Sequence, residues 1–397
     1  MIKFDFKTNT SKYFKDDDYD DLIQRKDEII NKLHNSKMNG WINEISSELI
    51  EDLKKTALMI KNTCDIMVVV GIGGSFLGSC AFDKMFRRYF DDNKFEIIYA
   101  GTTLSSKYMI QLIDYLKDKN FCINVISKSG TTMETSITYT LLKDILIEKY
   151  SVEEIKKRII LTTDEHNGLL REEAKENGYK SFIIPNDIGG RYSFITPAHL
   201  LPLAINYDLD NIINGYYSGK NLLNEAYEYA CIRYLLFKNG KYIENYVVHE
   251  ENMLFFSEWL KQLFGESEGK NGLGIFPVST LFTRDLHSLG QFIQDGNKII
   301  FETFIRIENS LEDIYYDNKK LNDINNLVID SVKRAHEKGS VPCINIEMDY
   351  LTLENVSSLI LFFEYAAAFS GFIYGINPFD QPGVEVYKKE VRDSLNK

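Results

Sequence analysis

The sequence has few cysteines, and they form none of the patterns typical of metal sites or disulfide frameworks. Five occur in 397 residues, an odd number, scattered as Cys64, Cys80, Cys122, Cys231 and Cys343. No two have the spacing of metal ligands, and several stand in apolar runs, which favours reduced, buried thiols in a cytosolic protein. We therefore predict no metal site and a cytoplasmic location.

Runs of basic residues and long apolar runs are also missing. The net charge is -12 without a cluster of lysine and arginine, which argues against nucleic acid and membrane as partners. The N-terminus lacks the apolar core of a signal peptide, and we expect no stretch long enough to span a bilayer. A small anionic ligand is still compatible with this charge, because a binding site needs only local positive charge.

Short apolar, β-branched runs alternate with helical patterns along most of the chain. This alternation predicts an α/β fold with parallel sheets in two domains. The expected parts are an N-terminal helical segment packing on the second domain, two α/β domains, and a C-terminal tail, to which the family resemblance described below assigns a part in the active site. Their predicted bounds are 1–60, 61–207, 208–375 and 376–397.

The stretch from Val125 to Thr135 is rich in hydroxyl groups and lies between an expected strand, 121–126, and an expected helix, 134–150. Its hydroxyl residues are Ser127, Ser129, Thr131, Thr132 and Thr135, and Gly130 allows a tight turn. Short donors at a helix start form a site for a doubly charged anion. This pattern favours phosphate on a small molecule, with Lys128 beside it. The alternative is an ordinary helix cap, which needs only one hydroxyl.

Two further strand ends carry polar or glycine-rich turns. Gly71 to Ser75 resembles a dinucleotide loop, but its spacing is not G-x-G-x-x-G and no acidic residue closes the second strand, so we expect no nicotinamide cofactor. Gly74 and Ser75 are candidates for sugar contacts, or for a purely structural turn. Gly190 and Arg191 follow another strand. Because ligands bind at the carboxyl ends of parallel strands, these turns and the hydroxyl-rich stretch suit one anionic ligand.

The second half of the chain offers three candidate catalytic side chains. Glu266 stands in what we predict to be a glycine-flanked loop, 265–270, which is either the site of a base or a solvated acidic loop. His287 is expected on a helix near Asp285, and a lone helical histidine is more often structural. The sequence pattern around Lys388 indicates nothing more than a solvated lysine.

Three stretches together resemble the glucose-6-phosphate isomerase family: Asp187–Ser193, Ser127–Thr135, and Phe379–Glu385 with Lys388. Residues 265–270 are similar to the loop around the family's base, in the form found in shorter bacterial members. The resemblance extends from about Val68 to Lys388. Pro382 departs from it, since many relatives have an aromatic residue there, and the chain is much shorter than animal members.

The resemblance implies two three-layer domains of the sugar-isomerase type and the interconversion of glucose 6-phosphate and fructose 6-phosphate through a cis-enediol. It implies Glu266 as the base, Arg191 as the fixed positive charge, and His287 and Lys388 as the groups that open the sugar ring. It also implies a homodimer with shared active sites and no metal or organic cofactor. The implied substrate contacts are Gly74, Ser75, Ser127, Lys128, Ser129, Thr132, Thr135, Gly190 and Gln381.

Alternative functions share the same fold. A non-catalytic sugar-phosphate sensor would keep the hydroxyl-rich loop and usually lose the base and the arginine, whereas both match here. An enzyme acting on an amino sugar phosphate would carry a further domain that is absent from this sequence. An additional phosphomannose isomerase activity is compatible with the sequence.

Overall fold

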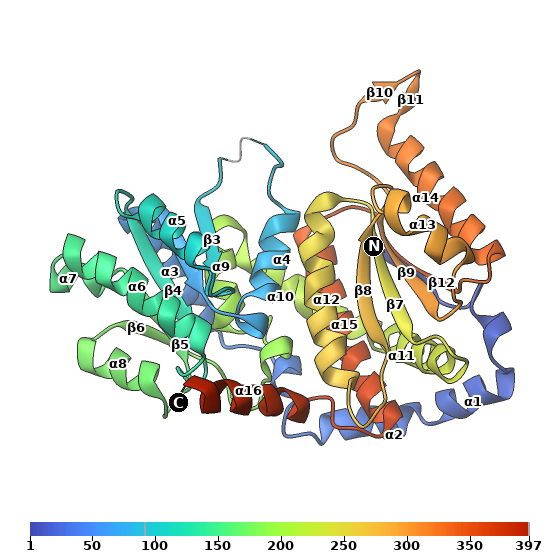
Figure 1. Ribbon diagram of the computed structural model, residues 1–397, viewed down its shortest axis with the longest axis horizontal. Coiled ribbons are helices and arrows are strands. Elements are labelled where there is room, and N and C mark those ends of the chain that lie inside the picture. The colour runs from blue at the N-terminus through green and yellow to red at the C-terminus, as the bar shows by residue number, and fades with distance from the viewer. Residues whose placement is uncertain (91–92, 396–397) are drawn as a thin grey trace. The chain divides into compact units, whose positions relative to one another are not determined.

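The computed structural model describes residues 1–90 and 93–395, which form two compact units. One is the Lys37–Ile213 unit, and the other is a two-segment unit made of Met1–Ser36 and Asn214–Lys397. Each contains a five-stranded sheet with helices on both of its faces (Figure 1). The prediction of an α/β fold built on two parallel sheets is confirmed, with one antiparallel edge strand as an addition.

The sheet of the Lys37–Ile213 unit is wholly parallel and has the strand order β3-β2-β4-β5-β6. Its strands are β2 (Ile66–Val70), β3 (Glu96–Ala100), β4 (Phe121–Ile126), β5 (Ile159–Thr163) and β6 (Lys180–Ile183). Every residue of β2, β4 and β5 is buried. This is the pattern of parallel strands that are covered on both faces, which explains their continuous apolar runs.

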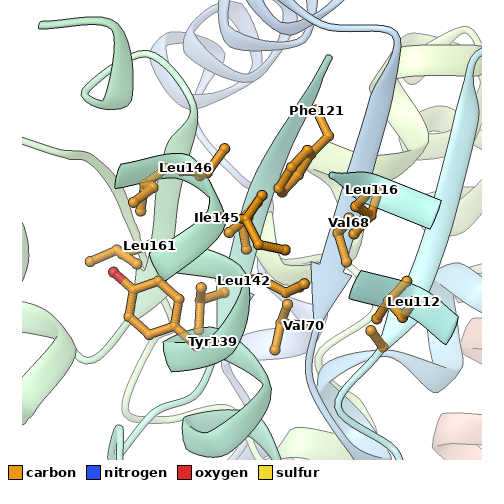
Figure 2. Packing of buried hydrophobic residues seen from close by; sticks show 14 of the residues in the cluster. Val68, Val70, Leu112, Leu116, Phe121, Tyr139, Leu142, Ile145, Leu146 and Leu161 are labelled. Atoms are coloured by element: carbon orange, nitrogen blue, oxygen red, sulfur yellow. The ribbon is translucent and has the colours of Figure 1, made fainter. Parts of the chain in front are cut away.

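Helices of this unit divide between the two faces of the sheet. One face carries α5 (Ser106–Leu116), α6 (Met133–Lys149), α7 (Val152–Ile155) and α8 (Leu169–Asn177). Figure 2 shows Leu142 and Ile145 of α6 packed with Val68 and Val70 of β2 in this layer. The other face carries α3 (Ser47–Thr63), α4 (Leu77–Met85) and α9 (Pro197–Asn206), and α9 contacts both α3 and α4. Short 3₁₀ turns lie at Gly40–Ile42, Gly73–Ser75 and Gly190–Tyr192.

The sheet of the two-segment unit has the strand order β1-β12-β9-β7-β8. Its parallel strands are β7 (Ile243–Val248), β8 (Phe276–Leu281), β9 (Ile300–Ile307) and β12 (Cys343–Met348). Strand β1 (Ile2–Asp5) joins β12 in the antiparallel sense and was not predicted, because residues 1–60 were expected to be helical. A separate hairpin pairs β10 (Tyr315–Tyr316) with β11 (Lys319–Lys320).

The helices of the two-segment unit also form two layers. Helices α13 (Leu286–Asp295) and α14 (Leu321–Lys338) pack on one face through Ile293 and Ile329. The other face carries α11 (Leu223–Lys238), α12 (Leu254–Glu268) and α15 (Leu353–Tyr374), and α15 contacts both α11 and α12. The remaining helices of this unit are α1 (Asp16–Gln24), α2 (Lys26–His34) and α16 (Pro382–Leu395), with 3₁₀ turns at Ser11–Tyr13, Gly219–Leu222 and Glu251–Met253. The boundary between the two units, after Ile213, falls within α10 (Leu209–Ser218).

Helix α15 corrects the expectation that no stretch is long enough to span a bilayer. By length and composition alone its 22 residues are sufficient, with a mean hydropathy of 1.7 over the most apolar window. However, 94% of that window is buried inside the protein. A helix that is apolar on all sides and covered by protein on all sides is a core helix, and this is the role of α15 here.

The compact units divide the N-terminal region differently from the predicted bounds. Residues 37–60, expected to accompany the second domain, belong to the Lys37–Ile213 unit. Trp41 is fully buried there and stacks on Tyr192 with ring centroids 5.2 Å apart, while Gly40 N–H donates to the carbonyl of Asp187 at 3.2 Å. These contacts, together with the packing of α3 on α9, explain why the division falls after Ser36.

A fully buried ion network joins α11, β7 and the end of α12 inside the two-segment unit. Arg233 Nε donates to Glu244 at 2.7 Å, and its Nη1 pairs with Glu268. Glu268 also accepts the Ile275 N–H at 3.2 Å, and hydroxyl groups of Tyr246 and Thr303 donate to Glu244. A single arginine thus pairs with two carboxylates that have no access to water.

Replacing Arg233 with methionine is expected to destabilise the protein by about 3–5 kcal/mol, because two buried carboxylates lose their counter-charge. Chemical denaturation of wild type and variant measures this loss. The matched control is Arg392→Met on the exposed face of α16, for which we expect a change within about 0.5 kcal/mol. Equal stability of the two variants would show that the buried network contributes nothing to the fold.

Candidate functional site

The strand order of the Lys37–Ile213 sheet reverses between β2 and β4. From β2 the chain moves to β3 on one side, and it then crosses to β4 on the other side. Helix α4 after β2 and helix α6 after β4 consequently leave on opposite faces, so the two loops at these carboxyl ends diverge. Ligands of open α/β sheets bind at such a reversal. The predicted residues Gly74 and Ser75 follow β2, and the predicted stretch Ser127–Thr135 follows β4.

The loop after β4 uses two of its hydroxyl groups to hold its own shape. Ser127 Oγ accepts the Gly130 N–H at 3.1 Å, and Ser129 Oγ accepts both the N–H and the hydroxyl of Thr131. Gly130 has a φ of +71°, a left-handed conformation that suits glycine. The sequence prediction treated all these hydroxyls as ligand donors, whereas the structure shows that Ser127 and Ser129 also organise the turn.

The hydroxyl groups of two threonines at the start of α6 do not take part in the hydrogen bonds of this turn. Thr132 is the N-cap residue and has extended backbone angles, but its side chain makes no cap hydrogen bond. Thr135 is 2% exposed, and its hydroxyl has no hydrogen-bond partner. The first N–H groups of a helix also lack partners within the helix. A buried hydroxyl without a partner lowers the stability of the fold by about 1–3 kcal/mol. An acceptor such as an anion could bind to this hydroxyl and to the free N–H groups at the start of the helix.

Lys128 lies in the same loop and links it to the segment after β6. Its ammonium group donates to the carbonyl of Pro185 at 3.1 Å. Burial lowers the pKa of Lys128, whereas the carboxylates of Asp164 and Asp187 oppose this shift. The lysine adds local positive charge at this edge of a sheet that belongs to an acidic protein.

The predicted residues Gly74, Gly190 and Arg191 lie together in the Lys37–Ile213 unit. A Cβ atom on Gly74 would lie 2.3 Å from the Gly190 carbonyl carbon and 2.8 Å from Arg191 N. Only glycine permits this approach of two backbones. Arg191 is 4% exposed, with its guanidinium carbon 5.7 Å from the Tyr192 ring centroid. The backbone at Arg191 therefore lies directly against the turn after β2.

Glu266 lies on α12, which corrects the predicted glycine-flanked loop. The helix continues through Gly265 to Glu268, and the turn follows only at residues 269–275, where Gly272 and Gly274 have positive φ angles. This turn also delays the next strand, which was predicted at 273–278 and begins at Phe276. Glu266 is half-buried, and Gln262 one turn earlier donates to it at 3.4 Å.

His287 lies on a helix, as predicted; it is the second residue of α13 and is exposed. Its neighbour Asp285 does not orient the imidazole in this structure. The Asp285 carboxylate accepts the Leu281 N–H at 2.7 Å and pairs with Arg284, whose hydrogen bond lowers the pKa of Asp285. His287 thus lies on the surface of the two-segment unit.

The C-terminal candidates lie on or next to α16. Gln381 directly precedes the helix, and Lys388 is exposed on it, 3.2 Å from Glu385 one turn earlier. Pro382, the departure from the family pattern, occupies the first residue of α16, where the fixed φ of proline suits a helix start. The structure thereby accommodates this residue without interrupting the helix.

Lys270 connects the Glu266 segment to the C-terminal segment. Its ammonium group donates to the carbonyls of Ser267 and Asn377 and pairs with Asp380 at 3.0 Å. Glu266 and Gln381 are therefore attached to one another through a short chain of contacts within the two-segment unit. The sequence interpretation did not assign a role to Lys270, or to Arg233 and Glu268, because their partners lie far away in the chain.

The site residues fall into two sets according to the compact unit that holds them. The Lys37–Ile213 unit holds Gly74, Ser75, Ser127, Lys128, Ser129, Thr132, Thr135, Gly190 and Arg191, and the two-segment unit holds Glu266, His287, Gln381 and Lys388. Across residues 1–90 and 93–395, no cluster of three or more histidine, cysteine or acidic side chains has the arrangement of a metal site. All five cysteines are free and buried.

Comparison with known sequences gives a family match over most of the chain. The family model described as phosphoglucose isomerase matches residues 29–271 and 310–397, so His287 lies outside the matched ranges. The glucose-6-phosphate isomerase of Clostridium tetani is 39% identical, over 98% of this chain and 95% of that protein. The enzyme of the same name from Mycoplasmopsis pulmonis is 42% identical, over 95% of this chain and 96% of that protein.

Comparison with solved structures gives the same fold at low identity. A glucose-6-phosphate isomerase from Chlamydia trachomatis has a TM-score of 0.82 at 17% identity, over 95% of this chain and 85% of that one. A hypothetical protein from Thermus thermophilus has a TM-score of 0.88 at 24% identity over the full length of both chains. At these identities the likeness concerns the fold, and it confirms the predicted sugar-isomerase type.

Replacing Thr135 with valine is expected to leave the stability of the unliganded protein unchanged or slightly higher, because the buried hydroxyl has no partner to lose. Binding of phosphate-bearing ligands should weaken by about tenfold, the value of one hydrogen bond to a charged group. Thermal unfolding and calorimetric titration with a sugar phosphate measure the two effects.

The control is Thr138→Val, which removes another buried and unpaired hydroxyl one turn further along α6. It should change neither stability nor phosphate affinity by a comparable amount. Equal affinities of wild type and the Thr135 variant would remove Thr135 from the anion site.

Proposed function

The chain belongs to the phosphoglucose isomerase family, and on this premise we propose that it interconverts glucose 6-phosphate and fructose 6-phosphate. The proposal is carried by the edge where the strand order reverses, since the hydroxyl-rich loop, the unpaired Thr135 and the Gly74–Arg191 contact all occur there. The redox change is internal to the sugar, so the chemistry needs neither a metal nor an organic cofactor.

The phosphate of the substrate is held by the loop after β4 and the start of α6. Ser127, Ser129 and Thr132 contribute hydroxyls or backbone N–H groups, Thr135 contributes its unpaired hydroxyl, and Lys128 contributes charge. Gly74, Ser75, Gly190 and Gln381 contact the remainder of the sugar. Binding at the phosphate end fixes the reacting carbons at a distance from it, so that binding energy is used for orientation.

Glu266 is the base that transfers a proton between C2 and C1 through a cis-enediol. Its carboxylate removes the proton from one carbon and returns it to the other, while the enediolate oxygen acquires negative charge. Arg191 stabilises that charge, since a fixed cation in a buried setting is effective there. The rigid anchoring of the end of α12 by Arg233 and Glu268 supports this role for Glu266.

His287 and Lys388 open the sugar ring by acting as acid and base on the ring and hydroxyl oxygens. In this proposal the protein is a homodimer in which His287 acts in the active site of the partner subunit, and the exposure of His287 supports this arrangement. The enzyme acts in glycolysis and gluconeogenesis in the cytoplasm, in keeping with its free cysteines.

A direct assay of fructose 6-phosphate conversion by the purified protein, with a chelator present, tests the proposed function. A sugar-phosphate sensor on the same fold would bind the ligand without turnover. The presence of both Glu266 and Arg191 favours the enzyme, since a sensor needs neither group.

Replacing Glu266 with glutamine is expected to lower kcat by about 1000-fold, or about 4 kcal/mol of barrier, because the shape is kept and the basicity is lost. Substrate should still bind. The control is Glu258→Gln on the same helix, which is partly exposed and pairs only with Lys261 among the ion pairs of the described residues. If the Glu266 variant turns over at the wild-type rate, another group is the base.

Mixing two inactive variants tests whether His287 acts across a dimer. Glu266→Gln and His287→Ala chains, refolded together, should recover about a quarter of wild-type activity, because about half of the dimers are mixed and each has one intact site. If each site used residues of one chain only, every site would keep one defect. Absence of recovery in samples shown to contain mixed dimers would therefore contradict the shared site.

A further inference from the structure

His199 is a buried titratable residue to which the proposed mechanism assigns no role. It lies on α9, is 2% exposed, and stacks on Phe194 with ring centroids 6.2 Å apart. Its ring reaches the turn after β2, from which it is separated by more than a hundred residues in the sequence. Gly78 leaves the room for this, since a Cβ atom there would lie 3.2 Å from the imidazole.

The hydrogen bonds of His199 determine which ring nitrogen carries the proton. The Ser79 N–H can only donate, and it lies 3.0 Å from Nδ1, which is therefore the acceptor. The proton of the neutral ring is on Nε2, which donates to the carbonyl of Gly74 at 2.8 Å. Burial lowers the pKa of His199 to about 4, so the ring is neutral near pH 7.

Ser193 extends this arrangement to the second turn. Its hydroxyl donates to the carbonyl of Gly190 at 2.6 Å, and its oxygen lies 3.2 Å from both His199 Nε2 and the Gly74 carbonyl oxygen. One imidazole and one hydroxyl thus hold the carbonyl groups of both glycines where the two backbones approach most closely. Arg191 directly follows Gly190, so the peptide plane that leads into Arg191 is fixed by the same contacts.

We propose that His199 is a positioning residue for the isomerisation: it fixes the Gly74 carbonyl and, with Ser193, the Gly190–Arg191 peptide, and so places Arg191 for the developing enediolate. His199 itself does not touch the substrate. This inference rests on the proposed function and concerns how the arginine of that same site is held in place.

Two substitutions separate the hydrogen bonds of the ring. In His199→Gln the amide nitrogen can take the place of Nε2 and donate to Gly74. In His199→Asn the amide oxygen can take the place of Nδ1 and accept from Ser79, while the bond to Gly74 is lost. If His199 positions the Gly74 turn, kcat of the Asn variant should fall by about 10- to 100-fold, the effect of a small misplacement of a catalytic group. The Gln variant should retain most of the wild-type kcat.

Binding measurements separate positioning from general damage to the fold. Inorganic phosphate binds in this proposal only at the loop after β4 and the start of α6, away from the Gly74 and Gly190 turns, so its affinity should be unchanged in both variants. The pH profile of the Gln variant should match that of wild type, because His199 exchanges no proton with the substrate. A second variant, Ser193→Ala, removes the hydroxyl that contacts the Gly190 and Gly74 carbonyls and should also lower kcat without weakening the binding of inorganic phosphate.

The positioning role is overturned if wild type is active and the Asn and Ser193→Ala variants have wild-type kcat. It is equally overturned if the Gln and Asn variants lose the same fraction of kcat, since packing alone would then explain the loss. If the Asn variant does not fold, a wild-type kcat in Ser193→Ala overturns the positioning of the Gly190–Arg191 peptide. Inactivity of the wild-type protein toward fructose 6-phosphate would instead refute the proposed function.

Discussion

The reversal of strand order between β2 and β4 is the constraint on which the rest of the candidate site depends. Right-handed crossovers send the chain to opposite faces after these two strands, which opens space above their carboxyl ends. Into this space the sequence places a turn with two consecutive glycines, Gly73 and Gly74, and a loop rich in hydroxyl groups. A helix start with a buried, unpaired threonine lies beside this loop, and we assign it to the phosphate of the substrate.

Rigid support surrounds the groups to which we assign chemistry, and in both units it consists of buried polar contacts. In the Lys37–Ile213 unit a neutral histidine and a serine hold two glycine carbonyls beside Arg191. In the two-segment unit Arg233 binds Glu268 near Glu266. Such networks contribute little net stability when every member is satisfied, but they specify one arrangement, which catalysis requires.

Local patterns in the sequence predicted the parallel strands well, because buried strands such as β2 and β4 are uninterrupted apolar runs bounded by glycine or polar turns. They failed where tertiary contacts decided the outcome. Gly265 was interpreted as a loop signal, yet α12 continues through it. Strand β1 was missed because its four residues gain their partner only in β12, at the other end of the chain. The role of His199 left no local signal, since its partners Gly74 and Ser79 are distant in sequence.

The most direct measurement of the central claim is the conversion of fructose 6-phosphate by the purified protein in D₂O, with a chelator present and the product followed by NMR. Transfer by a carboxylate through an enediol allows the base to exchange its proton with solvent. The account therefore predicts glucose 6-phosphate in which a measurable fraction carries deuterium at C2. Rapid conversion without any deuterium in the product would indicate a direct hydride shift, and no conversion would indicate a binding protein. Either result would contradict the account.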